Sequence, residues 1–393
     1  MRTSAHIVMV GCTAPSHIYP SLALIRELVD RGHRVSYVVG EPLTHLVKPT
    51  GAEPVAHPSI LPLGDTAWPE DPGTAMRVFL DEGIEVLPRL TERFDQDRPD
   101  LVLYDIGGLP GPLLGVRYGV PAVQLSPTMV AWNGYEDDMA EFLTALYASE
   151  SGRDYYATFD RWLADNGIHQ DAKRFLTHPD RVLSLIPRGM QPNADRVPDS
   201  VRFVGPCLDP LRLTDEAWTP PSNGRRVLLV SFGTAYNDQL PVYRACLEGF
   251  AGSGWHVVLA IGDKVDPADL GPLPANVEVH RTVPQLAVLA SAAAFVTHAG
   301  MGGCTEALWF GVPTVAIPQA VDQFANADRL VELGVGRHLP AEGITVESLR
   351  AAVDEVADDP QVRQRLAEVR AEVRANGGLH HAADAVEAYL PAR

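Results

Sequence analysis

The chain has 393 residues, a length that suits two α/β domains better than one. Hydrophobic residues make up 46% and charged residues 21%, so both halves can bury a core, and nothing indicates a disordered chain. The formal net charge of −18 argues against nucleic acid and anionic membrane surfaces as partners, because both need clustered lysine and arginine. A diphosphate can still bind through local backbone donors such as a helix N-terminus.

The N-terminal segment predicts a first strand rather than a signal peptide. A short apolar run, 7–10, ends at Gly11, and no apolar run reaches the roughly 18–20 residues that span a bilayer. The scattered cysteines show no metal-ligand spacing, so we expect free buried thiols at Cys12, Cys207, Cys246 and Cys304. We therefore expect a cytoplasmic protein, a monomer or homodimer, without stable membrane insertion.

The first half of the chain alternates strand and helix patterns. We expect strands at 6–11, 33–39, 101–104 and 121–125. A helix is predicted at 20–31, where Leu22, Ile25 and Leu28 have helical spacing and Pro20 suits the first turn. Residues 55–80 and 127–180 are less regular and rich in aromatic residues, which suits either the wall of a ligand pocket or ordinary packing.

The alternation restarts in the second half, after a segment rich in proline, aspartate and arginine. We expect strands at 227–231, 255–261, 277–280, 294–297 and 314–317, and helices at 240–250, 285–290, 305–310, 346–358, 360–375 and 378–390. Strands that alternate with helices predict parallel sheets, here in two Rossmann-like domains that face a cleft. The expected organisation is a domain at 1–205, a linker at 206–226, a domain at 227–375 and a C-terminal helix at 376–393 that can pack back on the first domain.

The densest motif runs from a strand into a glycine-rich turn and a helix that we expect to begin near Cys304. The turn contains Gly300, Gly302 and Gly303. These glycines let the backbone approach a ligand, and the first helix amides favour an anion. His298 can donate to a diphosphate oxygen, and Glu306, expected in the first turn, can accept both hydroxyls of a ribose. The alternative is a plain strand–turn–helix with a capping glutamate.

Asp322 and Gln323 follow the next predicted strand. Adjacent acceptors and donors at a strand end suit sugar hydroxyls. The alternative is that they cap the following helix.

A second set of polar residues follows strands of the N-terminal half. His17 lies in the loop after the first strand, and Asp105 follows the strand at 101–104, so both should lie at one edge of the sheet. A carboxylate beside an imidazole fixes the tautomer of a general base and stabilises the cation that forms. The alternatives are a histidine satisfied at a helix N-terminus and an aspartate that caps a turn. The DxD-like run at 95–97 lies before a strand, at the opposite edge, so we expect catalysis without a metal.

The ordered set of motifs resembles the GT-B glycosyltransferases of family 1, and in particular the macrolide glucosyltransferases of actinomycetes and related antibiotic deoxysugar transferases. The resemblance covers the whole chain. Its motifs occupy 98–105, 119–127, 131–135, 255–258, 283–286, 298–300 and 318–323.

The resemblance implies a role for each matching residue. His17 matches the general base and Asp105 its supporting acid. Among the donor contacts, Gln285 matches the residue beside the uracil, and Ser231 lies in a loop like the one near the diphosphate. His298 and Gly300 match phosphate contacts, Glu306 the ribose contact, and Asp322 and Gln323 the donor-sugar contacts.

Two residues depart from the family pattern on the donor side. Thr282 stands where many relatives have a tryptophan, and Cys304 stands where relatives usually have a serine. The first change removes an aromatic platform worth roughly 1–3 kcal/mol for a stacked base, and the second replaces a hydroxyl by a weaker donor.

The resemblance implies an inverting reaction, and together with the residues it predicts a metal-independent hexosyltransferase that needs no cofactor. It would move glucose or a related hexose from UDP-sugar to a hydroxyl of a hydrophobic natural product such as a macrolide. The acceptor is expected among Met76, Phe79, Ile106, Trp132 and Tyr135. The alternatives are a transferase that uses a TDP-deoxysugar, a sugar-nucleotide epimerase of the same fold, a two-lobed binding protein, and a non-catalytic partner of another transferase.

Overall fold

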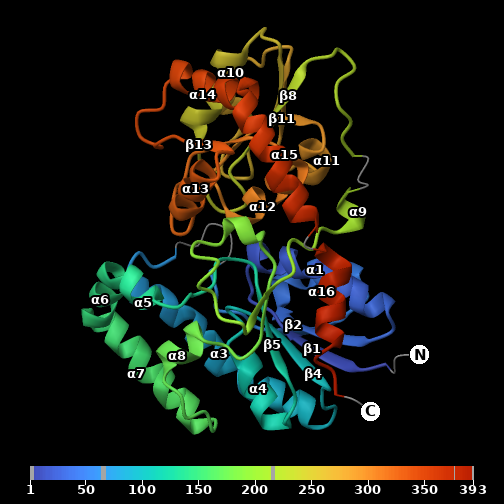
Figure 1. Cartoon of the computed structure of the whole chain (residues 1–393), viewed down its shortest axis with the longest axis vertical. Coiled ribbons are helices and arrows are strands. Elements are labelled where there is room, and N and C mark those ends of the chain that lie inside the picture. Colours follow the sequence, from blue (N-terminus) through green and yellow to red (C-terminus); the bar gives the residue numbers. More distant parts are fainter. Residues whose placement is uncertain (1–3, 63–67, 214–216, 376, 392–393) are drawn as a thin grey trace. The chain divides into compact units, whose positions relative to one another are not determined.

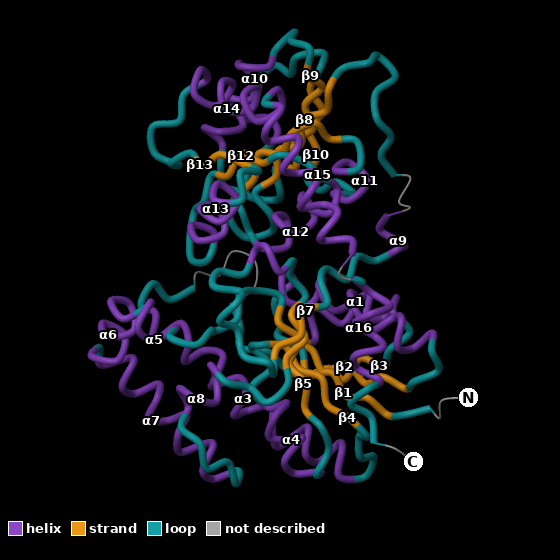
Figure 2. Tube along the Cα trace, in the orientation of Figure 1, coloured by secondary structure: helices purple, strands orange, loops and turns teal. Residues whose placement is uncertain are grey.

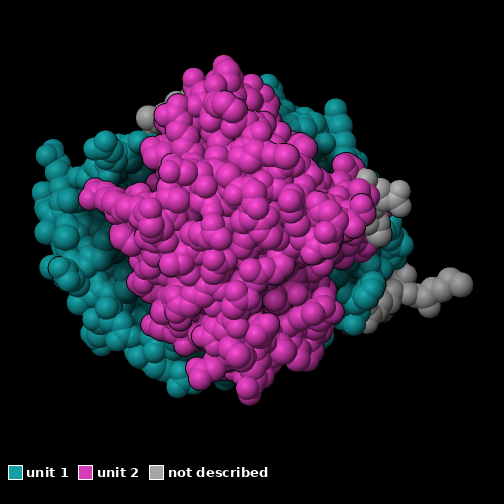
Figure 3. All heavy atoms as spheres, turned by 90° about the horizontal axis from the view of Figure 1, so that it is seen from above, with its two compact units in different colours: residues 1–186, 193–207, 379–393 teal, residues 187–192, 208–378 magenta. Residues whose placement is uncertain are grey.

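The computed structural model describes residues 4–62, 68–213, 217–375 and 377–391. The chain divides into two compact units (Figures 1 and 3). Unit 1 comprises residues 1–186, 193–207 and 379–393, and unit 2 comprises residues 187–192 and 208–378. Each unit is built around one parallel sheet, as the alternation of strands and helices predicts.

The sheet of unit 1 has seven parallel strands in the order β3-β2-β1-β4-β5-β6-β7 (Figure 2). They are β1 (His6–Val10), β2 (Arg34–Gly40), β3 (Glu53–His57), β4 (Leu101–Asp105), β5 (Ala122–Ser126), β6 (Val182–Ser184) and β7 (Val201–Phe203). The order reverses between β1 and β4, where Val10 pairs with Tyr104. In a doubly wound sheet, ligands bind at the carboxyl ends of the strands at such a switch point.

The helices of unit 1 include one from the end of the chain. They are α1 (Pro15–Asp30), α2 (Thr44–Val47), α3 (Pro72–Asp95), α4 (Pro110–Tyr118), α5 (Tyr135–Asp138), α6 (Ala140–Ala148), α7 (Glu150–Asp165), α8 (Ala172–Thr177) and α16 (Gly378–Glu387). Ala382 and Val386 of α16 are buried in the core that also contains residues of α1. Glu387 accepts a hydrogen bond of 3.1 Å from Arg31 and lies 3.1 Å from His33 Nε2.

Unit 2 has six parallel strands in the order β10-β9-β8-β11-β12-β13. They are β8 (Arg226–Ser231), β9 (Trp255–Ala260), β10 (Val277–His280), β11 (Ala292–Thr297), β12 (Thr314–Ala316) and β13 (Gly336–His338). The helices are α9 (Pro210–Leu213), α10 (Leu240–Phe250), α11 (Gln285–Leu289), α12 (Met301–Phe310), α13 (Gln323–Glu332), α14 (Val346–Asp358) and α15 (Pro360–Ala375). The switch point lies between β8 and β11, where Ser231 pairs with Thr297.

The central strands are apolar on both faces because helices cover both sides of each sheet. On β8, Leu228 and Val230 belong to one hydrophobic core, and Val227 and Leu229 belong to another. Such continuous apolar runs are typical of buried parallel strands. All four cysteines are free and buried, as expected. Within the described residues, no helix combines the length and the apolar character needed to cross a bilayer.

Two helices begin earlier than predicted. α1 begins at Pro15, so Pro20 lies inside the helix and not in its first turn, and His17 belongs to the helix rather than to a loop. α12 begins at Met301 rather than near Cys304. In both cases a residue with extended backbone, Ala14 or Gly300, is the N-cap. Pro20, taken as a helix start, and the glycines at 302 and 303, taken as a turn, lie inside the helices.

The segments at 55–80 and 127–180 contain more regular structure than predicted. The first includes the beginning of α3, and the second includes α5 to α8. Strands β3, β6, β7 and β13 were not predicted, and each has only three to five residues. Runs this short carry little periodicity, and these strands lie at or near the sheet edges.

Candidate active site

The first half of the candidate site lies at the switch point of unit 1. His17, in the first turn of α1, follows β1, and Asp105 ends β4. The distance between His17 Nδ1 and Asp105 Oδ1 is 2.9 Å, and the histidine donates because an ionised carboxylate only accepts. Asp105 Oδ1 also accepts a 2.8 Å hydrogen bond from the backbone N–H of Gly107. With the proton on Nδ1, Nε2 is the basic nitrogen of His17.

The thiol of Cys12 lies beside this pair. Possible ligand atoms of Cys12, His17 and Asp105 all lie within 4.8 Å of one another. Burial, followed by the charge of Asp105, raises the pKa of the Cys12 thiol well above its usual value, and a protonated thiol is a poor metal ligand. Asp95 and Asp97 of the DxD-like run form ion pairs with arginines. The expectation that the reaction needs no metal stays a prediction.

The residues predicted to contact an acceptor lie in three parts of unit 1. Met76 and Phe79 lie on α3, where Phe79 stacks on Trp68 with ring centroids 5.1 Å apart. Trp132 meets Tyr135 edge to face at 5.1 Å, and the indole N–H of Trp132 donates to Asp138 at 2.6 Å. Ile106 follows Asp105 directly. Trp132 is only 8% exposed, so most of its surface is already covered by the protein. The acceptor role of these residues stays a prediction.

The second half of the candidate site lies in unit 2. His298 follows β11, and its ring lies between two glycines. A Cβ atom at Gly233 would come within 2.7 Å of the ring, and one at Gly300 within 2.5 Å of Nε2. Burial lowers the pKa of His298 to about 4, so the ring is neutral at pH 7. Its Nδ1 is buried and makes no hydrogen bond of good geometry within the described part of the chain.

The turn before α12 leaves the start of the helix open. Gly300 is the N-cap, and it has no side chain that could cap the first backbone N–H groups. Ala299 has a φ of 62°, and its carbonyl accepts a 3.0 Å hydrogen bond from Asn326 Nδ2, which holds the turn. Gly302 is exposed with open space around it, whereas Gly303 faces the side chains of β11. An uncapped helix N-terminus favours an anion such as a diphosphate.

Glu306 is the centre of a polar cluster. It lies in the second turn of α12 rather than the first, because the helix begins earlier than predicted. Glu306 Oε2 accepts a 2.6 Å hydrogen bond from Gln285, and Oε1 accepts one of 3.3 Å from Arg212. Burial raises the pKa of Glu306, and Arg212 and Gln285 oppose this shift. The structure thus brings two of the predicted donor-site residues, Gln285 and Glu306, into direct contact. Sequence reasoning missed Arg212, because its segment shows no periodicity and a lone arginine there gives little signal.

The loop after β12 contains the residues predicted to contact the donor sugar. Asp322 is the N-cap residue of α13, but its side chain does not cap the helix; it accepts a 3.0 Å hydrogen bond from Asn326. Gln323 is 3% exposed, and its Oε1 accepts from the backbone N–H groups of Gln319 and Ala320 at 2.8 and 3.2 Å. Gln323 therefore closes the loop, and the donor roles of both residues stay predictions.

The remaining donor-side residues differ in accessibility. Ser231 ends β8 and is 7% exposed, and Thr282 is exposed. Cys304 is completely buried, and its backbone N–H donates to the carbonyl of Gly300 at 3.1 Å. The thiol therefore has no surface from which to contact a donor. The prediction that Cys304 stands in for a donor-contacting hydroxyl finds no support in this geometry.

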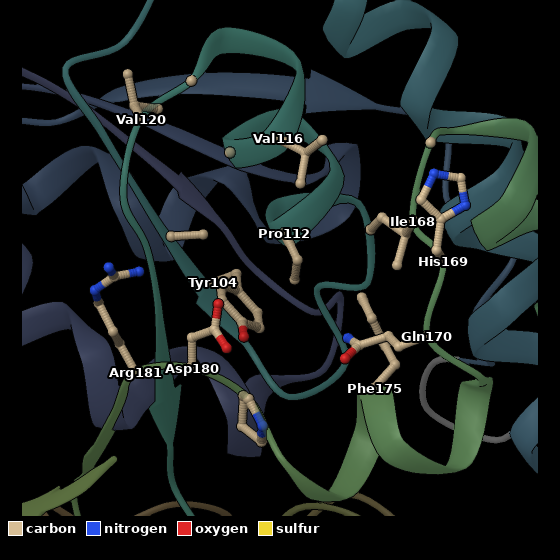
Figure 4. A pocket seen from close by; sticks show the side chains of 15 residues that line it. Tyr104, Pro112, Val116, Val120, Ile168, His169, Gln170, Phe175, Asp180 and Arg181 are labelled. Atoms are coloured by element: carbon tan, nitrogen blue, oxygen red, sulfur yellow. The ribbon is translucent and has the colours of Figure 1, made fainter.

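A cavity of about 460 Å³ in unit 1 is separate from the predicted residues (Figure 4). Pro112 and Val116 of α4 and Phe175 of α8 line it, and Tyr104 of β4 points into it. Successive strand residues face opposite sides of a sheet, so Tyr104 and Asp105 serve different faces of β4. No predicted site residue lines this cavity, which therefore does not belong to the candidate active site.

Comparison with known proteins identifies the family. The family described as "Erythromycin biosynthesis protein CIII-like, C-terminal domain" matches residues 247–388. The oleandomycin glycosyltransferase of Streptomyces antibioticus is 48% identical, over 100% of this chain and 92% of that protein. An NDP-glycosyltransferase of Bacillus licheniformis is 35% identical over 98% of each chain. The crystal structure of the glycotransferase of kitacinnamycin has a TM-score of 0.92 and 45% identity over the full length of both chains. The chain therefore belongs to the GT-B glycosyltransferases of the macrolide and antibiotic type.

Proposed function

We propose that the chain is an inverting glycosyltransferase that moves a hexose, glucose first, from UDP-sugar to a hydroxyl of a hydrophobic natural product such as a macrolide. The observation that carries this proposal is the 2.9 Å hydrogen bond between His17 Nδ1 and Asp105 Oδ1 at the switch point of unit 1. It prepares a base, and the reaction needs one to activate a hydroxyl. The similarity to an oleandomycin glycosyltransferase supports the class of acceptor.

His17 has a definite task in the proposed reaction. Its Nε2 takes the proton of the acceptor hydroxyl as the oxygen attacks the anomeric carbon. The bond from that carbon to the diphosphate oxygen breaks in the same step, and the electron pair leaves with UDP. Attack opposite the leaving group inverts the configuration at the carbon. Asp105 stabilises the imidazolium that forms and holds its tautomer.

The residues of unit 2 would hold the donor. The open N-terminus of α12 and the neutral ring of His298 would donate hydrogen bonds to the diphosphate as negative charge develops on it. Glu306 would accept from the ribose, and Gln285 would lie beside the base. Asp322 and Gln323 would contact the sugar. These groups provide the stabilisation of the leaving group that a metal ion provides elsewhere, so we propose that no metal or cofactor is required.

Mass spectrometry of reaction products tests the proposal. UDP-glucose, UDP-GlcNAc and TDP-sugars are each incubated with a panel of macrolides and flavonoids, with and without EDTA. Glucosylated macrolide from UDP-glucose, formed equally in EDTA, is the expected result. Product from TDP-sugars alone would replace the proposed donor, and loss of product in EDTA would contradict the metal-free mechanism. No product and no donor hydrolysis across the panel would overturn the enzymatic function.

The His17→Ala variant tests the assigned base. We expect turnover to fall by about 10²–10⁴-fold, the usual contribution of a general base. Donor affinity should change little, because the proposed donor contacts lie in unit 2. Full activity in this variant would refute the assignment.

A further inference from the structure

Both carboxylate oxygens of Glu306 are engaged within the protein itself. Oε2 accepts from Gln285 Nε2 at 2.6 Å, and Oε1 accepts from Arg212 Nη2 at 3.3 Å. The carboxylate is buried, with 11% of the side chain exposed. A ligand hydroxyl that approaches this carboxylate therefore meets two resident donors.

The two donors hold Glu306 with different strength. Arg212 makes the longer contact, and 37% of its side chain is exposed, so water can solvate the guanidinium once it leaves. It lies on α9, a helix of only four residues that packs against α11. Gln285, at the start of α11, makes the shorter bond to the other oxygen. Arg212 is therefore the partner that can move aside, in part, when a ligand hydroxyl approaches Oε1.

A ribose has two neighbouring hydroxyls, so the partners of both Glu306 oxygens affect how it binds. Its two neighbouring hydroxyls match the two oxygens of a carboxylate, and each oxygen has two lone pairs. A hydroxyl at Oε2 shares that oxygen with a neutral amide donor. A hydroxyl at Oε1 shares it with a charged guanidinium, whose charge-assisted bond makes that oxygen the weaker acceptor for a second donor. The hydroxyl at Oε1 therefore adds less binding free energy than it would at a carboxylate without an arginine partner.

We propose that Arg212 is a donor-specificity residue, because it competes with one ribose hydroxyl for Glu306 Oε1. The site then recognises the sugar of the nucleoside mainly through the other hydroxyl, which binds Oε2. The inference rests on the proposed function, which makes Glu306 the ribose acceptor. A nucleoside diphosphate that lacks the competing hydroxyl loses little affinity at this site. Arg212 thereby widens the range of nucleotide donors that the protein accepts.

Isothermal titration calorimetry with three nucleotides tests this role. UDP, 2′-deoxy-UDP and 3′-deoxy-UDP are titrated into the unmodified protein, Arg212→Met and Arg212→Gln. In the two variants, the preference for UDP over one of the deoxy analogues should rise about two- to fivefold, the size of a partly exposed ion pair. Arg212→Lys, which keeps the charge but loses the planar fork, should lie between. Arg337→Met is the matched control, because Arg337 pairs with Glu355 in the same unit, and it should not alter the preference.

Each outcome has a distinct meaning. If the preference rises for neither analogue in either variant, or if all three nucleotides weaken equally, Arg212 does not compete for Glu306 and the inference falls. If the unmodified protein binds none of the nucleotides, the proposed function itself fails. Melting temperatures close to that of the unmodified protein establish that the variants are folded.

Discussion

The substitution Asp105→Asn separates two contributions of the carboxylate to catalysis. Asp105 Oδ1 accepts from both His17 Nδ1 and the backbone N–H of Gly107, at 2.9 and 2.8 Å. In the asparagine variant, the amide oxygen should stay in this position, because the flipped amide would turn its NH₂ group toward the N–H of Gly107. The histidine tautomer is then retained, and only the negative charge is lost.

The expected loss follows from the strength of that one hydrogen bond. A hydrogen bond to a charged group contributes about 1.5–3 kcal/mol and one between neutral groups about 0.5–1.5 kcal/mol. The difference of about 1–2 kcal/mol falls on the imidazolium that forms in the transition state. It corresponds to about a 5- to 30-fold decrease in kcat, because 1.36 kcal/mol is a factor of ten. Asp105→Ala, which leaves His17 Nδ1 without this acceptor, should lose more and approach the effect of His17→Ala.

The assay is the initial rate of glucosylation of a macrolide, followed by mass spectrometry for the three variants side by side. UDP affinity by calorimetry should be the same in all of them and serves as the control for intact donor binding. An Asp105→Asn variant as inactive as His17→Ala would refute the reasoning that Gly107 holds the amide in place. Full activity would show that the charge contributes nothing.

Three further predictions concern the donor half of the site. Gly300→Ala should weaken UDP binding about tenfold or more, since the new Cβ would lie 2.5 Å from His298 Nε2 and overpacking costs about 1–3 kcal/mol. Gly254→Ala, whose Cβ meets nothing within 4 Å, is the control, and equal UDP affinities in the two variants would contradict the predicted clash. Because burial raises the pKa of Glu306, its carboxylate takes up a proton at a higher pH than an ordinary glutamate, so UDP affinity should fall as pH is lowered from 8 to 5.5. An identical fall in the Glu306→Gln variant would show that another group causes the pH dependence. Thr282→Trp should tighten UDP binding, because a stacked base contributes about 1–3 kcal/mol, and unchanged affinity would exclude stacking at this position.

Much of the architecture could be predicted from local patterns. Alternating apolar runs and helical spacing predicted two parallel-sheet domains, and the central strands lie within one or two residues of their expected bounds. His17 and Asp105 could be paired in advance, because both follow strands whose carboxyl ends lie at one edge of the sheet. The boundaries of α1 and α12 could not, since Pro20 and the glycines at 302 and 303 are typical of helix starts and turns but lie inside these helices.

The sequence by itself determined which chemical groups are present and at which strand ends they stand. Only the tertiary structure decided their partners. The order of strands makes β1 the neighbour of β4 and brings His17 to Asp105, 88 positions away. Arg212 reaches Glu306 across 94 positions, and the packing around α12 buries the thiol of Cys304 completely. Periodicity encodes the face that an element buries, whereas its contacts depend on which elements the whole chain packs beside it.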